Sequence, residues 1–175
     1  RGLYHGDIKF ENVLVSGAGG EVQVRLGDYD FVRRSGYRPP EGVVQGTLSY
    51  YSPEQIQEDE YTSKTDIYAL GIMMFYALGG LRERDPDDQM DRVVQGDFDY
   101  DSLSAPRRLK WIIRQCMSLE PEDRPNIKKL IRQIEDFLVS DEMDRYEKNG
   151  RDEPPSKWYN TSARDEYYGG QVQAL

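Results

Sequence analysis

The longest run of apolar positions in this chain extends from Ile67 to Leu78. Its apolar residues fall on every face of a helix, which is typical of a helix buried on all sides. The run is twelve residues long, whereas a membrane-spanning helix needs about 20 apolar residues. We therefore predict a buried helix that is capped by Ser63 or Thr65 and ends at Gly79 and Gly80.

Helical spacing of apolar residues predicts three further helices after this run. We place a short one at about residues 89–95, a second at about residues 106–118, and a third after Pro125. Cys116, the single cysteine, is in step with the apolar face of the second, so we expect it to pack rather than react. The third helix has one apolar face, formed by Ile127, Leu130, Ile131, Ile134 and Leu138.

Near the start of the chain the pattern changes to the alternation of a β-hairpin. Residues 13–15 form a short apolar strand, residues 16–20 (SGAGG) supply a turn, and residues 22–26 alternate on the return strand. Residues 33–45 are rich in Gly and Pro and lack periodicity, which predicts an exposed loop. We also expect an acidic connector over residues 54–61 and a charged loop over residues 81–88 that contains a proline.

Polar residues flank both ends of this hairpin. Because a hairpin brings its ends together, we expect Asn12 and Asp28 to meet at its open end, with Asp7 and Lys9 just upstream. One acid, one amine and two oxygen ligands would then face a common point. Phosphoryl transfer from a metal nucleotide needs this set of groups.

Four motifs carry a resemblance to a known family. Residues 5–12 (HGDIKFEN) and 28–30 (DYD) resemble the protein-kinase catalytic loop and D-F-G motif. Residues 46–54 (GTLSYYSPE) resemble the G-T-x-x-Y-x-A-P-E segment, and residues 66–71 (DIYALG) resemble the start of the central helix of that family. Arg124 falls where the family places the arginine that pairs with the A-P-E glutamate.

Small-molecule phosphotransferases of the aminoglycoside and choline kinase type also have a His-Gly-Asp motif. The segment at residues 46–54 has no counterpart in those enzymes. The order of the motifs across residues 5–125 therefore favours the protein kinases, and we identify the chain as similar to that family.

The resemblance implies a fold that is mainly α with a small β-hairpin (α+β), namely a protein-kinase C-terminal lobe over residues 1–140. The N-terminal lobe, with its glycine-rich loop, strand lysine and helix glutamate, is absent from this chain. We therefore expect the chain to be a piece of a longer protein. Residues 141–175 are charged and poor in aliphatic side chains, so we expect a disordered linker or tail.

The resemblance also implies catalytic roles for four residues. Asp7 would accept or orient the proton of the substrate hydroxyl, and Lys9 would contact the transferred phosphoryl group of ATP. Asn12 and Asp28 would hold Mg²⁺.

Further residues receive supporting roles by the same resemblance. His5 would pack and form hydrogen bonds without taking part in the chemistry, and Asp66 would brace the backbone of the catalytic loop. Glu54 and Arg124 would form an internal ion pair.

The choice of substrate is implied by residues beside this loop. Lys9 and Thr47 are the residues that serine/threonine kinases of the family carry at these places. Glu11 at the mouth of the cleft favours a basic residue on the substrate. We thus expect transfer of the ATP γ-phosphate to Ser or Thr of proteins by the full-length protein, and no activity from this fragment alone.

Two departures from the family pattern leave an alternative open. Gly6 stands where most kinases have the Arg that receives an activation-loop phosphate, so regulation by such phosphorylation is not expected. Asp30 replaces the Gly of D-F-G, where a side chain is expected to strain the backbone and adds a second carboxylate. A pseudokinase that acts as a binding or allosteric scaffold is the alternative, and a small-molecule phosphotransferase is less favoured.

The charge of the chain bears on its partners. A net charge of −9 argues against nucleic acid and favours a basic protein substrate or a regulatory protein partner. One histidine and one cysteine are too few for a structural zinc site. The scarcity of cysteine and the lack of a membrane-length apolar run lead us to expect an intracellular, cytoplasmic location.

Overall fold

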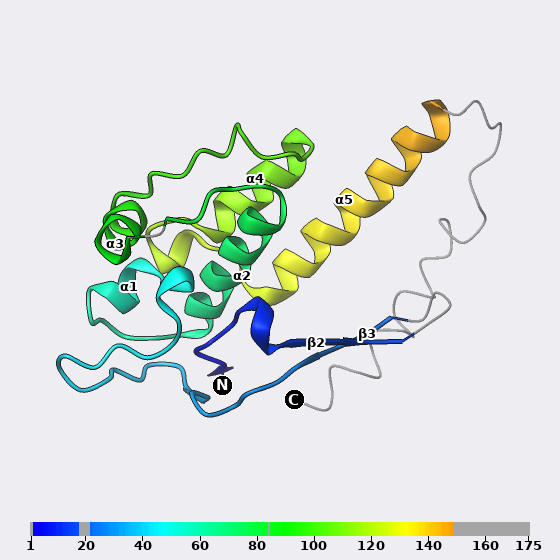
Figure 1. Cartoon of the computed structure of the whole chain (residues 1–175). Helices are drawn as coiled ribbons and strands as arrows, with labels where there is room; N and C mark the ends of the chain where they lie inside the picture. The colour runs from blue at the N-terminus through cyan, green and yellow to red at the C-terminus, as the bar shows by residue number, and fades with distance from the viewer. Residues whose placement is uncertain (1, 18–21, 84, 149–175) are drawn as a thin grey trace. The chain divides into compact units, whose positions relative to one another are not determined.

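The computed structural model describes residues 2–17, 22–83 and 85–148, with side chains up to residue 140. The chain divides into two units, residues 1–132 and residues 133–175, and the helical core, both sheets and the candidate site lie in the first. Among the described residues helices predominate, as predicted, together with two small two-stranded sheets (Figure 1). Within the described part of the chain, no helix is long and apolar enough to cross a bilayer.

The predicted buried helix is α2, which spans Ser63–Ala77. Its cap is Thr62 rather than Ser63 or Thr65, because Thr62 is the residue with extended backbone and its side chain accepts a backbone amide from the first turn. Thr65 returns the contact, since its hydroxyl oxygen accepts the Thr62 amide at 3.1 Å. This reciprocal arrangement satisfies two otherwise unpaired amides at the start of α2.

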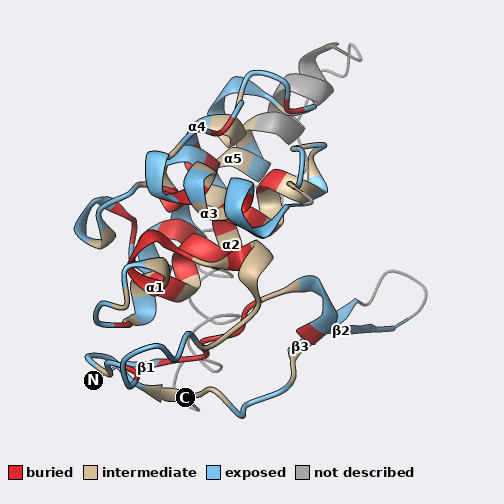
Figure 2. Cartoon of the chain, turned by 60° about the vertical axis from the view of Figure 1, so that its left-hand side comes forward, coloured by how far each residue is buried: buried red, intermediate tan, exposed pale blue. Residues whose placement is uncertain are grey.

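The core of the first unit forms around α2, which packs against α4 (Arg107–Cys116). Figure 2 shows that the residues of α2 are mostly buried or of intermediate exposure. The two helices approach closely at Gly71, where an added Cβ would lie 2.7 Å from the Met117 side chain and 2.9 Å from Cys116 Cβ. The Cys116 side chain is fully buried, and burial raises the pKa of its thiol to about 12, which fits the predicted packing role.

Two helices begin where the sequence predicted loops. α3 spans Pro86–Gln95 and starts earlier than predicted, because Asp85 caps it and proline is favourable in the first helical turn, where its missing N–H costs nothing. α1 spans Pro53–Ile56 and overlaps the start of the predicted acidic connector. A capping box between Ser52 and Gln55 holds this single turn.

The third predicted helix is α5, which spans Ile127–Lys148. Asn126 precedes it and accepts the Lys129 amide at 2.9 Å, as a helix cap does. The helix continues past the boundary predicted at residue 140, because residues 141–148 are charged but include strong helix formers. The rest of the predicted tail, residues 149–175, lies outside the described residues.

The predicted hairpin is confirmed as β2 (Val13–Ser16) and β3 (Gln23–Leu26), which pair antiparallel with Val13 opposite Leu26. Away from its open end the residues of the hairpin are exposed (Figure 2). The exposed fraction is between 59% and 68% for each of four apolar residues in and beside these strands: Leu14, Val15, Val22 and Val24.

A second small sheet was not predicted. It pairs β1 (Leu3–Tyr4) with β4 (Arg33–Arg34), and both strands are too short to show a periodic pattern. A bridge between Tyr37 and Tyr61 follows. The loop predicted over residues 33–45 is therefore anchored at its beginning and largely exposed after that.

Candidate active site

The backbone before Asp7 is held by a carboxylate from the first turn of α2. Asp66 accepts the His5 amide at 2.6 Å and the Gly6 amide at 2.9 Å. Burial raises the pKa of Asp66, while these two amides act in the opposite direction. Gly6 has φ +83°, and a Cβ there would lie 3.0 Å from the Phe31 carbonyl oxygen, so a larger residue would be strained at this position.

His5 connects this loop to the end of the hairpin. Its Nδ1 accepts the Asp7 amide at 3.3 Å, so its Nε2 is the nitrogen that donates to the Gly27 carbonyl at 3.1 Å. The Gly27 amide in turn donates to the Asn12 carbonyl at 2.8 Å. These bonds fix the backbone on which Asp7, Asn12 and Asp28 stand.

The Asp7 carboxylate is the centre of a closely packed polar cluster and is only 4% exposed. One oxygen accepts the Thr47 hydroxyl at 2.7 Å, and the other lies 2.6 Å from Lys9 Nζ and 3.2 Å from Asn12 Nδ2. Lys9 Nζ also donates to the Thr47 hydroxyl at 2.8 Å. The hydrogen bond to Asp7 raises the pKa of Lys9, so its ammonium stays charged at neutral pH.

Asn12 and Asp28 stand at the end of the hairpin but differ in burial. Asn12, in the 3-10 helix η1 (Phe10–Asn12), is buried, and its side-chain nitrogen donates to the Asp7 carbonyl at 2.8 Å, which leaves its Oδ1 to face other groups. Asp28 is exposed, and its charge contributes to the raised pKa of Lys9. Among the described residues, no hydrogen bond joins Asp28 to Asn12 or Asp7.

The donor chemistry of this pair suits Mg²⁺, which prefers amide and carboxylate oxygens. Within the described ranges, no group of three or more His, Cys, Asp or Glu residues could hold a metal ion. Asn12 and Asp28 therefore remain a predicted pair of ligands that relies on further oxygens from substrate or water.

The backbone strain expected at Asp30 lies instead at Asp28. Asp28 has φ +59°, whereas Asp30 is not among the described residues with positive φ. The Asp30 amide approaches Asp28 Oδ1 at 3.5 Å, and its carbonyl accepts Arg33 Nη1 at 3.0 Å. The side chain at position 30 is accommodated because the left-handed turn falls two residues earlier.

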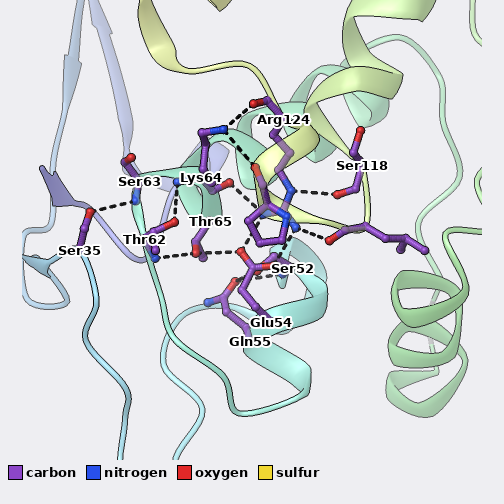
Figure 3. A network of polar contacts seen from close by, with 12 residues as sticks. Ser35, Ser52, Glu54, Gln55, Thr62, Ser63, Lys64, Thr65, Ser118 and Arg124 are labelled. Atoms are coloured by element: carbon purple, nitrogen blue, oxygen red, sulfur yellow. Dashed lines mark hydrogen bonds and ion pairs between the residues drawn. The ribbon is translucent and has the colours of Figure 1, made fainter.

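Away from this cluster, Glu54 and Arg124 form a buried ion pair, shown in Figure 3. Both guanidinium Nη atoms lie 2.7 Å from the carboxylate oxygens, and the Thr65 hydroxyl donates to the same carboxylate at 2.9 Å. Burial lowers the pKa of neighbouring Lys64, and the nearby Arg124 charge adds to this effect. The other donors of Arg124 reach the carbonyls of Lys64, Ser118 and Leu119.

Comparison with known proteins shows the family to which the chain belongs. The sequence model of the protein kinase domain matches residues 1–134. The chain belongs to the protein kinase family. The kinase chain is 31% identical to the serine/threonine-protein kinase Nek9 of Xenopus laevis over 137 residues, which is 74% of this chain and 14% of Nek9.

Two other relatives of this kinase chain differ in their names: one is called a kinase and the other an inactive kinase. It is 36% identical to the serine/threonine-protein kinase PknL of Mycobacterium tuberculosis over 131 residues, 70% of this chain and 32% of PknL. It is 27% identical to the inactive tyrosine-protein kinase RYK of Caenorhabditis elegans over 144 residues, 78% of this chain and 25% of RYK. The kinase chain thus spans about a third or less of the length of these relatives.

A cavity of about 610 Å³ opens beside Thr47 and was not foreseen from the sequence. Its walls come from the segment that contains the 3-10 helix η2 (Leu48–Tyr50), from residues 82 and 83, and from residues 85, 86 and 89 at the start of α3. Arg82 and Gln89 belong to this lining. Neither lies in one of the motifs that identified the kinase chain, so only the fold brings them beside Thr47.

Proposed function

We propose that this chain is the C-terminal lobe of a serine/threonine protein kinase that uses ATP and Mg²⁺. The observation that carries the proposal is the cluster in which Asp7 contacts Lys9, Asn12 and Thr47. It combines an acceptor for a hydroxyl proton with a fixed cation, which is what transfer of a phosphoryl group requires. Within the family, the N-terminal lobe of the full-length protein supplies the rest of the ATP site.

Each residue of the cluster has a distinct task in this proposal. Asp7 orients the acceptor hydroxyl and takes its proton, and Lys9 stays protonated and offsets the charge on the transferred phosphoryl group. Asn12 Oδ1 and the Asp28 carboxylate are the ligands for Mg²⁺, which neutralises phosphate charge when bound. Thr47, hydrogen-bonded to both Asp7 and Lys9, supports a Ser or Thr acceptor on a protein.

A pseudokinase is the second candidate because of residues 28–30. Asp28 is exposed, stands in the left-handed region and approaches the amide of Asp30, which replaces the family glycine. This geometry favours a site with altered metal binding. In that case the protein would act as a binding or allosteric scaffold for another protein.

The test is phosphate transfer by the full-length protein and its Asp7→Asn variant. Asparagine keeps the shape of the side chain but cannot take a proton, so we expect the transfer rate to fall by about 10²-fold or more. The measurement is incorporation of labelled phosphate from Mg²⁺–ATP into a mixture of Ser- and Thr-containing peptides. The isolated 175-residue chain should be inactive in the same assay.

Asp97→Asn is the matched control, because Asp97 is an exposed aspartate outside the cluster and its loss should leave the rate unchanged. Equal rates for Asp7→Asn and the unaltered protein would overturn the catalytic role of Asp7. A thermal shift with Mg²⁺–ATP but no transfer would support the scaffold instead.

A further inference from the structure

The cavity beside Thr47 adjoins the position where an acceptor hydroxyl would meet Asp7. Thr47 lines the cavity and donates its hydroxyl to Asp7 at 2.7 Å. A peptide whose acceptor reaches Asp7 would therefore have neighbouring residues near the mouth of this cavity. The side chain of a neighbouring peptide residue is the group placed to enter it.

Gln89 supplies a buried amide in the wall of the cavity. It is only 2% exposed, and neither its side-chain oxygen nor its side-chain nitrogen has a hydrogen-bond partner. The Tyr76 phenol is near the Gln89 amide, and this amide opposes the rise in the pKa of Tyr76 that burial causes. The phenol proton is nevertheless donated to the Ser49 carbonyl, at 3.0 Å, and not to Gln89. A buried amide without partners is costly, so its position points to a ligand that completes it.

The lining of the cavity contains one arginine and two carboxylates. Glu83 is neutralised by an ion pair with Arg92. The Asp85 carboxylate accepts the amides of Asp87 and Asp88 at the start of α3, at 2.9 and 3.4 Å. Both carboxylates are thus already engaged by groups of the protein.

Arg82 is the cation in the lining that these two carboxylates do not pair with. It is exposed, and no carboxylate of the described residues lies within ion-pair distance of it. It lines the same cavity as Gln89, and its positive charge acts to lower the pKa values of Tyr50 and Tyr76. The cavity therefore offers a cation and an amide N–H to its occupant.

We propose that this cavity binds an acidic side chain of the protein substrate, close to the phosphorylated residue, an inference that rests on the proposed kinase function. Arg82 binds the carboxylate of that side chain, and the Gln89 side-chain nitrogen donates to it. The basic residue expected near Glu11 occupies a different place on the substrate. The favoured substrate then carries both an acidic and a basic residue around its Ser or Thr.

Binding of peptides to the full-length protein tests this without requiring phosphate transfer. Fluorescent peptides with Ala at the acceptor position would carry Glu, Gln or Lys at each flanking position in turn, and anisotropy would give their affinities. At one position we expect Glu to bind about three- to tenfold more tightly than Lys. Arg82→Glu should reverse this order, whereas Arg107→Glu, outside the cavity lining, should keep it.

Gln89→Leu provides a second variant at a buried position. It should reduce the preference for Glu over Gln while the circular dichroism spectrum stays unchanged. If this variant does not fold, the exposed Arg82→Glu variant still tests whether the cavity binds an acidic side chain. A preference for Lys, no preference at any position, or an unchanged preference in Arg82→Glu would each overturn the assignment.

The two proposals fail in different ways. Phosphate transfer that depends on Asp7, combined with equal binding of Glu and Lys peptides at every position, would leave the kinase function standing and remove the acidic subsite. A preference for Glu without any transfer would support the subsite and place it in a scaffold.

Discussion

Thr47 connects the acid and the cation of the candidate active site through a single hydroxyl group. It donates to Asp7 at 2.7 Å and accepts from Lys9 at 2.8 Å. Because Lys9 also lies 2.6 Å from Asp7, the three side chains form a closed triangle. Removing the hydroxyl would leave Asp7 and Lys9 paired but less firmly oriented.

Thr47→Val tests this arrangement at constant side-chain shape. A hydrogen bond to a charged group contributes about 1.5–3 kcal/mol, so we expect kcat to fall by about tenfold to a hundredfold. Thr47→Ser retains the hydroxyl and should keep most of the rate. Steady-state phosphate transfer by the full-length protein is the measurement, and a Val variant as active as the Ser variant would contradict the role of the hydroxyl.

The spacing of residues in the sequence was enough to nominate Asp7, Lys9 and Asn12, because they lie within one short loop and its positions are fixed by local bonds. The exposure of Asp28 was harder to predict, because it depends on a left-handed backbone conformation at Asp28 that the local sequence did not indicate. Arg82 and Gln89 gave no signal at all. Their nearness to Thr47 arises only when η2 and α3 pack together.

Among the secondary-structure elements, the closeness of α2 and α4 depends on one glycine. Gly71→Val should lower the free energy of unfolding by about 1–3 kcal/mol, because the added atoms would overlap Met117 and Cys116. The measurement is the urea midpoint of the full-length protein. Ala77→Val, at an exposed position of the same helix, is the control and should change the midpoint little. Equal midpoints for the two variants would show that α4 moves freely.

Helices and strands with a clear hydrophobic pattern were predicted well, whereas helices whose start depends on a capping residue were not. A continuous apolar run located α2, apolar periodicity located α4 and α5, and alternation located the β2–β3 hairpin. Pro86 was interpreted as a loop residue, yet a proline after a capping Asp85 is an equally good start for a helix. The short pair of β1 and β4 depends on contacts between distant residues, which no local pattern reveals.

At the scale of the whole molecule, several buried acids hold their protons to high pH. Burial raises the pKa of Cys116 from 9.0 to about 12, and those of Tyr61 and Tyr100 from 10.0 to about 12. The unfolded chain loses these protons near the ordinary values while the native chain keeps them. The stability contributed by each group is therefore complete below its ordinary pKa and is lost as the pH rises through about 12.

Alkaline unfolding should reflect this protonation. We expect the free energy of unfolding, measured by urea denaturation, to fall as pH rises above about 9, with a slope of at most about 1.4 kcal/mol per pH unit for each group. Cys116→Ala should be less stable at every pH because of its cavity, but its slope above pH 9 should be smaller. An identical slope in the variant would show that the thiol titrates normally in the folded protein.

The pair of Glu54 and Arg124 has a consequence for how the chain is made. Seventy residues separate the two partners, so a growing chain exposes the glutamate long before its arginine leaves the ribosome. A buried carboxylate without its partner costs about 3–5 kcal/mol. The helical core should therefore mature late in synthesis, and chains that stop short of residue 124 should be prime targets for chaperones and proteases.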